Sequence, residues 1–488
     1  MKLGKHIFGV GVMTGISRIF GFIRDMLIAR FLGAGRLSDI FFAAFKLPNL
    51  FRDLLGEGAL SAIFIPMYTD IDKDKGFAEN VFSWLMVILL GLTIIFEIAM
   101  PLVVWALAPG FSEEPGKLQL TILIARIMFF YVIFICGAAF LSAVLNAHSR
   151  FLLAAFMPVM LNLMLIGALA GSLWYGNQYI IYVIAATVVL SGIIQFFTLW
   201  WRIRRKNFGL RLIVPHWNGQ IKSLFKRFCV SLVGSGFYQI TIIIGTLVAS
   251  WQSGAVSWLY YSDRMIQLPF AMIGLAVGTV LISSISKALT DKNMRSVYIQ
   301  QNSSIRRSMM LIIPCMVGLF VLAEPIIRIL FQHGAWTPES TQAVALAIKI
   351  QCLVLPAMLI SQIYSKTLYA SQDVNTPVKT SMVSLGVASV IYLALFPFIG
   401  YLSIPVGVVI SGYVKNYLLG RVCRKRELIK TDKKTFVSMA VFGIISVILG
   451  GILYMVNIPN IWILGVAMAV FAILYLPTAF IIDRRIIK

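Results

Sequence analysis

An apolar stretch near the start of the chain carries charged side chains in its middle. Residues 11–32 read GVMTGISRIFGFIRDMLIARFL and contain Arg18, Arg24 and Asp25. A charge near the centre of a bilayer costs roughly 2.5–3.5 kcal/mol even on the most permissive insertion scale. We therefore expect these side chains to line a polar cavity or to pair with one another. Arginine in such a cavity suits phosphate, because it binds two oxygens at once and stays charged when partly desolvated.

The next apolar stretch carries charges of both signs, namely Asp39, Lys46, Arg52, Asp53 and Glu57. All of them except Arg52 fall within about 40° of one another on an ideal helix. Pro48, Gly56 and Gly58 can bend or unwind this helix. One interpretation is a charge-paired stripe that only holds helices together. The other is a cavity wall in which basic groups outnumber the acidic groups that neutralise them, which favours binding of anionic oxygens.

A third candidate lies in the second half of the chain. Asp263 and Arg264 stand about one helical turn before Pro269 in SWLYYSDRMIQLPFAMIGLAVGT. They either form a local pair near the outer membrane surface, or Arg264 joins the arginines of the first half across a central cavity. Sequence alone leaves both interpretations open.

No pattern in the chain predicts a catalytic or metal site. There is no Gly-rich phosphate loop with a Lys, no aspartate-rich metal motif and no HExxH. The five cysteines include no CxxC pair, and the four histidines are far apart. Glu324 and Arg328 are spaced i,i+4, which we interpret as a surface pair rather than an acid/base site.

The elements that position these residues must be membrane helices. The chain has 488 residues, of which 59% are hydrophobic and 12% are charged, whereas soluble proteins average about 25% charged residues. Continuous apolar runs of about 20 residues predict an all-α polytopic membrane protein and exclude an alternating β-barrel. The net charge of +23 is attributed mainly to basic cytoplasmic loops, not to nucleic-acid binding.

We predict fourteen helices, near residues 2–32, 36–70, 78–108, 117–147, 151–173, 177–206, 220–250, 255–290, 295–331, 338–370, 374–396, 402–427, 434–456 and 460–483. Loops rich in Lys and Arg alternate with loops that nearly lack them, such as HGAWTPES at 333–340 and NIPN at 457–460. This alternation predicts that both termini are cytoplasmic.

A weak repeat divides the chain. Leu47-Pro48 and Leu268-Pro269 are 221 residues apart, and LNAHSRF resembles LYASQDV at an offset of 223. Two six-helix lobes of this kind suit alternating access. We predict an N-lobe at 1–206, a basic cytoplasmic linker at 207–219, a C-lobe at 220–427 and two further helices at 428–488. The last two helices are almost uncharged, which suggests contact with lipid or an acyl chain.

Several segments closely resemble the MurJ (MviN) family of lipid II flippases, in the MOP transporter superfamily. They are SRIFGFIRD, SDIFFAAFKLPNLFRDLLGEGA, VSWLYYSDRMIQLPF, LAVGT, NAHSRF and NTPVKT. The resemblance runs essentially from end to end. It implies two six-helix lobes around a cavity, with a groove for a polyprenyl tail on the last two helices.

The resemblance also implies roles for single residues. The family's substrate-binding arginines match Arg18, Arg24, Arg52 and Arg264, with Asn49 nearby. Its charge partners or gating residues match Asp25, Asp39, Glu57, Lys46 and Asp263. Some relatives hold sodium with acidic and Asn ligands in helices seven and eleven. Here helix seven has no acid, and residues 376–396 of helix eleven (TPVKTSMVSLGVASVIYLALF) include neither Asp nor Asn. We therefore expect no cofactor and no such sodium site. Membrane potential or an ion gradient would drive the cycle.

The function that follows is transport rather than catalysis. We expect the chain to flip the undecaprenyl-diphosphate-linked peptidoglycan precursor, lipid II, in the bacterial cytoplasmic (inner) membrane, as a monomer. Membrane lipids and the wall-synthesis or division machinery are the other expected partners. A flippase for another polyprenyl-linked glycan and a MATE-like exporter are the alternatives. An exporter of organic cations would favour an acid-rich cavity, and a glycosyltransferase would need catalytic carboxylates.

Overall fold

The computed structural model describes residues 2–54, 59–205, 208, 210–291, 293–456 and 458–487. Every regular element in these ranges is helical, and each of the fourteen predicted intervals contains helix. Nine helical segments of the described chain are long and apolar enough to cross a membrane. Three of them each contain two successive helices, namely Lys117–Ala147, Pro338–Ala370 and Asn375–Lys425. The predicted all-α polytopic architecture is therefore confirmed.

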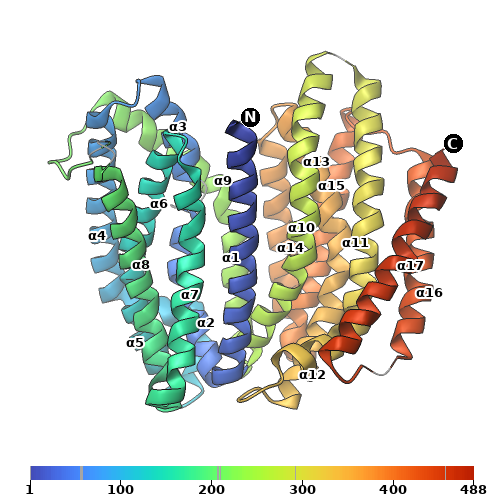
Figure 1. Cartoon of the computed structure of the whole chain (residues 1–488), viewed down its shortest axis with the longest axis horizontal. Helices are drawn as coiled ribbons and strands as arrows, with labels where there is room; N and C mark the ends of the chain where they lie inside the picture. Colours follow the sequence, from blue (N-terminus) through green and yellow to red (C-terminus); the bar gives the residue numbers. More distant parts are fainter. Residues whose placement is uncertain are drawn as a thin grey trace. The chain divides into compact units, whose positions relative to one another are not determined.

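The first compact unit, Met1–Val256, holds the helices drawn in blue to green in Figure 1. They are α1 (Lys2–Leu32), α2 (Arg36–Phe51), α3 (Ala59–Asp70), α4 (Lys75–Leu107), α5 (Lys117–Phe129), α6 (Tyr131–Ala147), α7 (Phe151–Tyr175), α8 (Ile180–Arg205) and α9 (Gly219–Ala249), with short 3₁₀ turns η2 (Pro109–Ser112) and η3 (Asn177–Tyr179). Helix α1 packs along α7, and α2 packs on α5. The first pairing places the charged stretch of α1 beside an uncharged helix, whereas the second places α2 beside a helix that carries Lys117 and Arg126.

The second compact unit, Ser257–Lys488, contains most of α10 (Ala255–Thr290) and all later helices. These are α11 (Met294–Phe331), α12 (Pro338–Gln351), α13 (Leu355–Ala370), α14 (Asn375–Ile399), α15 (Ser403–Lys425), α16 (Lys433–Tyr454) and α17 (Ile461–Ile487), with 3₁₀ turns η4 (Cys352–Val354) and η5 (Gly400–Leu402). Helix α11 is central, since it contacts α12, α13, α16 and α17.

Three predicted helices are each divided in two. The interval 36–70 forms α2 and α3, the interval 117–147 forms α5 and α6, and the interval 338–370 forms α12 and α13. In the first case the backbone widens to a π-type turn at residues 52–54. Pro48 lies one turn before it, inside α2, and lacks the N–H that would bond to the preceding turn.

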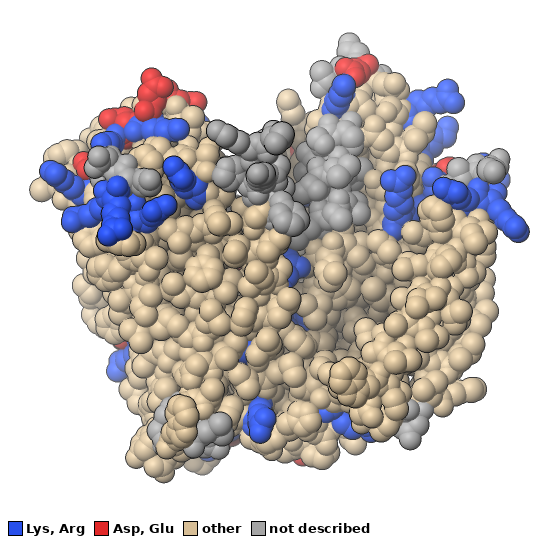
Figure 2. Space-filling model, viewed as in Figure 1, with Lys and Arg blue, Asp and Glu red and all other residues tan. Residues whose placement is uncertain are grey.

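The predicted lobes and the compact units use different criteria. Helix α9 was assigned to the second lobe by the repeat, yet it contacts α3 and α4 and belongs to the first compact unit. A repeat reports internal symmetry, whereas a compact unit reports packing, so the lobe boundaries remain predictions. Figure 2 shows that in each unit most of the visible Lys and Arg side chains gather toward one end, while the broad middle is largely uncharged.

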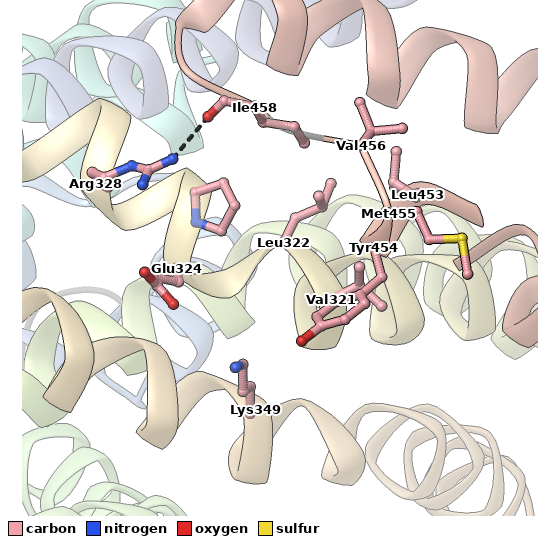
Figure 3. A pocket seen from close by; sticks show the side chains of 11 residues that line it. Val321, Leu322, Glu324, Arg328, Lys349, Leu453, Tyr454, Met455, Val456 and Ile458 are labelled. Carbon is pink, nitrogen blue, oxygen red and sulfur yellow. Dashed lines mark hydrogen bonds between the residues drawn. The ribbon is translucent and has the colours of Figure 1, made fainter. Parts of the chain in front are cut away.

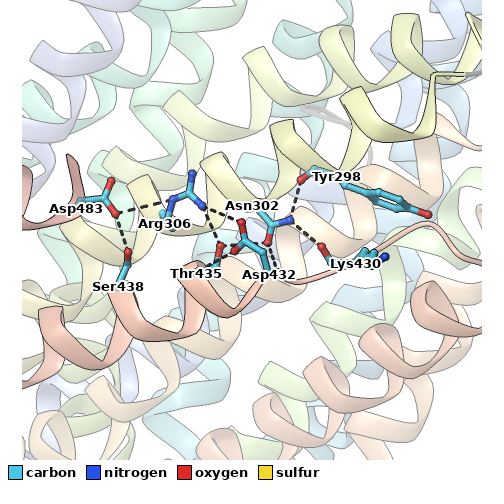
Figure 4. Close-up of polar contacts among 8 residues, drawn as sticks. All are labelled: Tyr298, Asn302, Arg306, Lys430, Asp432, Thr435, Ser438 and Asp483. Atoms are coloured by element: carbon cyan, nitrogen blue, oxygen red, sulfur yellow. Dashed lines mark hydrogen bonds and ion pairs between the residues drawn. The ribbon is translucent and has the colours of Figure 1, made fainter. Parts of the chain in front are cut away.

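A polar cluster ties the last two helices to α11 (Figure 4). The Arg306 guanidinium lies 3.4 Å from Asp432 and 3.9 Å from Asp483, and it donates to Thr435 Oγ1 at 3.1 Å. Asn302 donates to Lys430 O at 2.8 Å. Helices α16 and α17 are thus anchored at one end by ion pairs, while much of their apolar surface is exposed, including Phe436, Val447 and Phe480.

Candidate functional site

Arg24 of α1 is held by an adjacent carboxylate and by an amide on α7. Its Nη2 lies 2.7 Å from Asp25 Oδ1, and its Nη1 donates to Asn162 Oδ1 at 3.0 Å. The Asn162 amide nitrogen in turn donates to Ser17 O at 3.1 Å. Asp25 is fully buried, whereas the Arg24 side chain is 12% exposed. The guanidinium is therefore oriented by neutral and acidic partners but still reaches the protein surface.

Arg52 follows the same pattern at the π-type turn after α2. Its Nη2 lies 3.1 Å from Asp53 Oδ1, and Asp53 Oδ2 accepts a hydrogen bond from Gln239 of α9 at 3.3 Å. The Arg52 and Asp53 side chains are 27% and 39% exposed. Here too an arginine is paired with its sequence neighbour, and that neighbour is fixed by an uncharged side chain.

Asp39 belongs to a closed cluster instead. Its Oδ2 accepts from Lys117 Nζ at 3.0 Å and from the Gly254 N–H at 2.8 Å. Lys117 also pairs with Glu114 at 2.7 Å. The side chains of Asp39 and Lys117 are completely buried. A buried pair of this kind keeps its charges only because each group has several partners.

Glu114 is the partly exposed member of this cluster, in the loop between α4 and α5. Partial burial raises the pKa of Glu114, but hydrogen bonds from the side chains of Lys117 and Ser253 outweigh that effect. The positive charges of Lys117 and Arg36 act in the same direction. The pKa of this carboxyl group is therefore lowered, and the charged form is favoured.

The predicted stripe on α2 meets one neighbouring segment. Lys46 donates to Thr246 Oγ1 and, at 3.5 Å, to Ile242 O of α9. Asp39 contacts Gly254 and Asp53 contacts Gln239. The three residues are spaced seven apart in the sequence, and their partners are spaced eight and seven apart in descending order. The α2 region and the segment 239–254 therefore run antiparallel along this line of contacts. This arrangement favours the interpretation in which these three stripe residues join helices.

The other predicted residues of the first unit are placed as follows. Arg18 is half-buried on α1 and makes no hydrogen bond or ion pair with the part of the chain that the structure describes. The Asn49 amide oxygen is buried without a hydrogen-bond partner among the described residues, which is unusual for a buried polar atom. Glu57 lies outside the described residues. Arg18 and Asn49 therefore remain candidates for binding a ligand.

In the second unit, Asp263 accepts a hydrogen bond from the Gln351 side chain of α12. Gln351 also accepts from Ser262 Oγ at 2.7 Å, so α10 and α12 share a buried polar contact. Arg264 is half-buried on α10. Its approach to the arginines of the first unit remains a prediction.

The partners of the charged residues are not predicted by any sequence pattern described above. Asn162, Gln239 and Thr246 are neutral polar residues within apolar runs, and the Gly254 contact is made by the backbone. A helical-wheel comparison of α7 and α9 could have shown the first three as isolated polar positions. Nothing in the sequence marks a backbone N–H as the partner of Asp39.

Known proteins provide an independent comparison. The profile of the family described as "Lipid II flippase MurJ" matches residues 28–473. The chain belongs to this family. A probable lipid II flippase MurJ of Rhizobium tropici is 33% identical over 459 residues, covering 91% of this chain and 86% of the relative. That of Rhizobium meliloti (strain 1021) is 36% identical over 429 residues, covering 86% and 80%.

Solved structures agree on the fold. "Lipid II flippase MurJ, inward closed conformation" superposes with a TM-score of 0.84 at 24% identity, covering 98% of this chain and 99% of that one. An inward-facing multidrug resistance MATE transporter of the MOP superfamily gives 0.69 at 15% identity, covering 84% and 94%. The MurJ family is one of transporters, so the chain is a multi-pass bacterial membrane protein of a non-enzymatic class.

Proposed function

We propose that this chain moves lipid II from the cytoplasmic to the outer leaflet of the bacterial inner membrane by alternating access. Its headgroup is large, sugar-bearing and anionic, so it cannot cross hydrocarbon unaided. Arg18, Arg24, Arg52 and Arg264 would hold the diphosphate. The observation that carries the proposal is that Arg24 of α1 and Arg52 after α2 are each held by a neighbouring carboxylate yet partly exposed, within a chain of the lipid II flippase family.

The described contacts support a ligand-binding role for these groups. Arg24 and Arg52 each pair with an adjacent carboxylate, which lowers the net positive charge of the proposed site when no substrate is bound. Arg18 adds a positive charge with no acidic partner in the described part of the chain. A diphosphate would accept charge-assisted hydrogen bonds from all three. The buried Asn49 amide oxygen would suit a hydroxyl or amide donor of the headgroup.

The exposed apolar surface of α16 and α17 supports a place for the polyprenyl tail. Ile444, Val447 and Ile448 of α16 are each about 60% exposed in the protein alone. Surface of this kind is stable next to lipid or an acyl chain. The tail would remain in the membrane along these two helices while the headgroup crosses.

Transport needs only differential binding in two conformations. Asp25, Asp39, Glu57, Lys46 and Asp263 would exchange partners with the arginines or with neighbouring helices between states. Membrane potential or an ion gradient would return the empty carrier, without a sodium site of the kind found in some relatives. Replacing sodium by potassium in a reconstituted assay should then leave the rate unchanged, and dependence on sodium would overturn this part.

The main test is headgroup appearance in the outer leaflet after depletion of the native protein and complementation. Arg18→Ala and Arg264→Ala, expressed at normal levels, should reduce transport by about 10–100-fold, since a lost charge-assisted hydrogen bond is worth about 1.5–3 kcal/mol. Arg30→Ala is the matched control, because Arg30 is exposed in the last turn of α1. Normal transport by both cavity variants would refute the arginine mechanism.

The substrate is tested separately in proteoliposomes of the purified chain. Lipid II should be moved faster than another polyprenyl-diphosphate-linked glycan, and organic cations should not be moved. Equal rates for the two glycolipids would reduce the proposal to diphosphate recognition. Export of organic cations would favour the MATE-like alternative.

A further inference from the structure

A charged pocket lies within the second unit, and none of the predicted site residues lines it. Residues of α11, α12, the end of α16 and the segment after it line an open pocket of about 450 Å³ (Figure 3). Three charged residues line it, namely Glu324, Arg328 and Lys349. The i,i+4 spacing of Glu324 and Arg328 predicts only a surface pair, and neither residue has a role in the proposed transport mechanism.

The charged groups of this pocket are not paired with one another. Glu324 and Lys349 point toward each other from α11 and α12 (Figure 3), yet neither makes an ion pair or side-chain hydrogen bond with a described residue. Arg328 donates one hydrogen bond, from Nη2 to Ile458 O at 2.9 Å. The pocket therefore presents two cationic groups and one carboxylate to a ligand.

The other residues that line the pocket are mainly apolar. Val321 and Leu322 form part of the wall, and the end of α16 supplies exposed side chains. Tyr454, Met455 and Val456 are 76%, 87% and 44% exposed. Arg328 is in the last turn of α11, next to the loop that the charge pattern places on the outer side of the membrane. Polar headgroups of the outer leaflet lie at this depth, and acyl chains begin just below it.

We propose that this pocket binds the headgroup of an aminophospholipid, which carries one phosphate diester and one primary ammonium group. The phosphate would lie between Arg328 and Lys349, and the ammonium would donate to Glu324. The acyl chains would follow Tyr454 and Met455 into the membrane. Opposite charges in the ligand thus match opposite charges in the pocket, which leaves no charged group of the pocket unpaired.

The same charges disfavour other phospholipids. An anionic glycerol headgroup satisfies Arg328 and Lys349 but offers Glu324 no positive charge. A choline headgroup carries a positive charge but has no N–H to donate to the carboxylate, and its methyl groups hold the charge further away. The Glu324 carboxylate is thus the specificity-determining group, and the two basic residues supply most of the affinity.

Titration of the purified full-length protein with lipid tests this proposal. Short-chain phosphatidylethanolamine, phosphatidylglycerol and phosphatidylcholine are added in detergent, and bound lipid is measured by native mass spectrometry. The wild-type chain should bind phosphatidylethanolamine about tenfold more tightly than either of the others, the effect of one charge-assisted contact. Tighter binding of phosphatidylglycerol would overturn the proposal in favour of an anionic-lipid site.

Variants assign the binding to the pocket. Glu324→Gln should abolish or invert the preference for phosphatidylethanolamine over phosphatidylglycerol, whereas Arg328→Gln and Lys349→Gln should each weaken the binding of all three lipids. Glu339→Gln is the matched acidic control, because Glu339 is exposed in the first turn of α12. Unchanged lipid binding in the three pocket variants would refute the site. Lipid II transport is assayed in parallel, so failure of this proposal is distinguishable from failure of the transport mechanism.

Discussion

The Asp39–Lys117 pair and the Arg24–Asp25 pair both hold opposite charges in the first unit, but their surroundings differ. Asp39 and Lys117 are fully buried, and each has a further partner, the Gly254 N–H and Glu114. Asp25 is fully buried as well, yet Arg24 keeps an exposed edge. The first arrangement encloses both charges, whereas the second presents one of them. Complete enclosure is what a structural pair requires, and an exposed edge is what a ligand requires.

This comparison predicts different consequences of mutation for the two pairs. Removing one member of an enclosed pair leaves an uncompensated buried charge, which costs more than the pair itself contributes. Arg24 is partly exposed, and its replacement by lysine keeps a cation beside the buried Asp25, so this change should affect the fold less than it affects ligand binding. We therefore expect substitution of Lys117 to reduce mainly the stability of the protein, and substitution of Arg24 to reduce mainly transport.

The largest effect is expected from Lys117→Met. The buried Asp39 carboxylate would keep the Gly254 N–H but lose its cation, so the free energy of unfolding should fall by about 3–5 kcal/mol. Thermal or denaturant unfolding of the detergent-purified protein measures this. The double variant Asp39→Asn, Lys117→Met should recover part of the loss, because it removes both charges. A loss below about 1 kcal/mol in the single variant would contradict this expectation, because exposed surface ion pairs contribute that little.

A smaller effect, on transport rather than stability, is expected from Arg24→Lys. Lysine keeps the charge but cannot reach Asp25 and Asn162 at once through a planar fork. Transport of lipid II should fall about tenfold, the equivalent of one lost charge-assisted contact. Arg30→Lys on the same helix is the control. Full activity of Arg24→Lys would indicate a simple requirement for positive charge and would contradict a bidentate role for the guanidinium.

The two pairs also show how far sequence could lead. The cost of charges in apolar runs was enough to identify Arg24, Asp25 and the stripe on α2, and helix periodicity placed that stripe on one face. It could not separate enclosed from exposed charges, because enclosure depends on distant partners. Lys117 stands at the start of another helix, and Gly254 contributes only its backbone. The division of the interval 36–70 was likewise missed, since Pro48 permits a bend without fixing where the helix ends.

The smallest effect is expected at Glu114, the partly exposed member of the Asp39–Lys117 cluster. The pKa of Glu114 is lowered in the folded protein, so this carboxylate stabilises the fold above the pKa of the unfolded chain, near 4.3. That stabilisation should disappear as the pH falls through the lower pKa of the folded state. Because Glu114 is partly exposed, the contribution is expected to be no more than about 1 kcal/mol.

Unfolding measured from pH 6 down to pH 3 should therefore depend less steeply on pH in Glu114→Gln than in the wild-type chain. Glu113→Gln is the control, because Glu113 is exposed and makes no ion pair with the described residues. The two variants should differ only at acidic pH if Glu114 acts through Lys117. An identical pH dependence in both would mean that Asp39 alone neutralises Lys117 and that Glu114 does not stabilise the cluster.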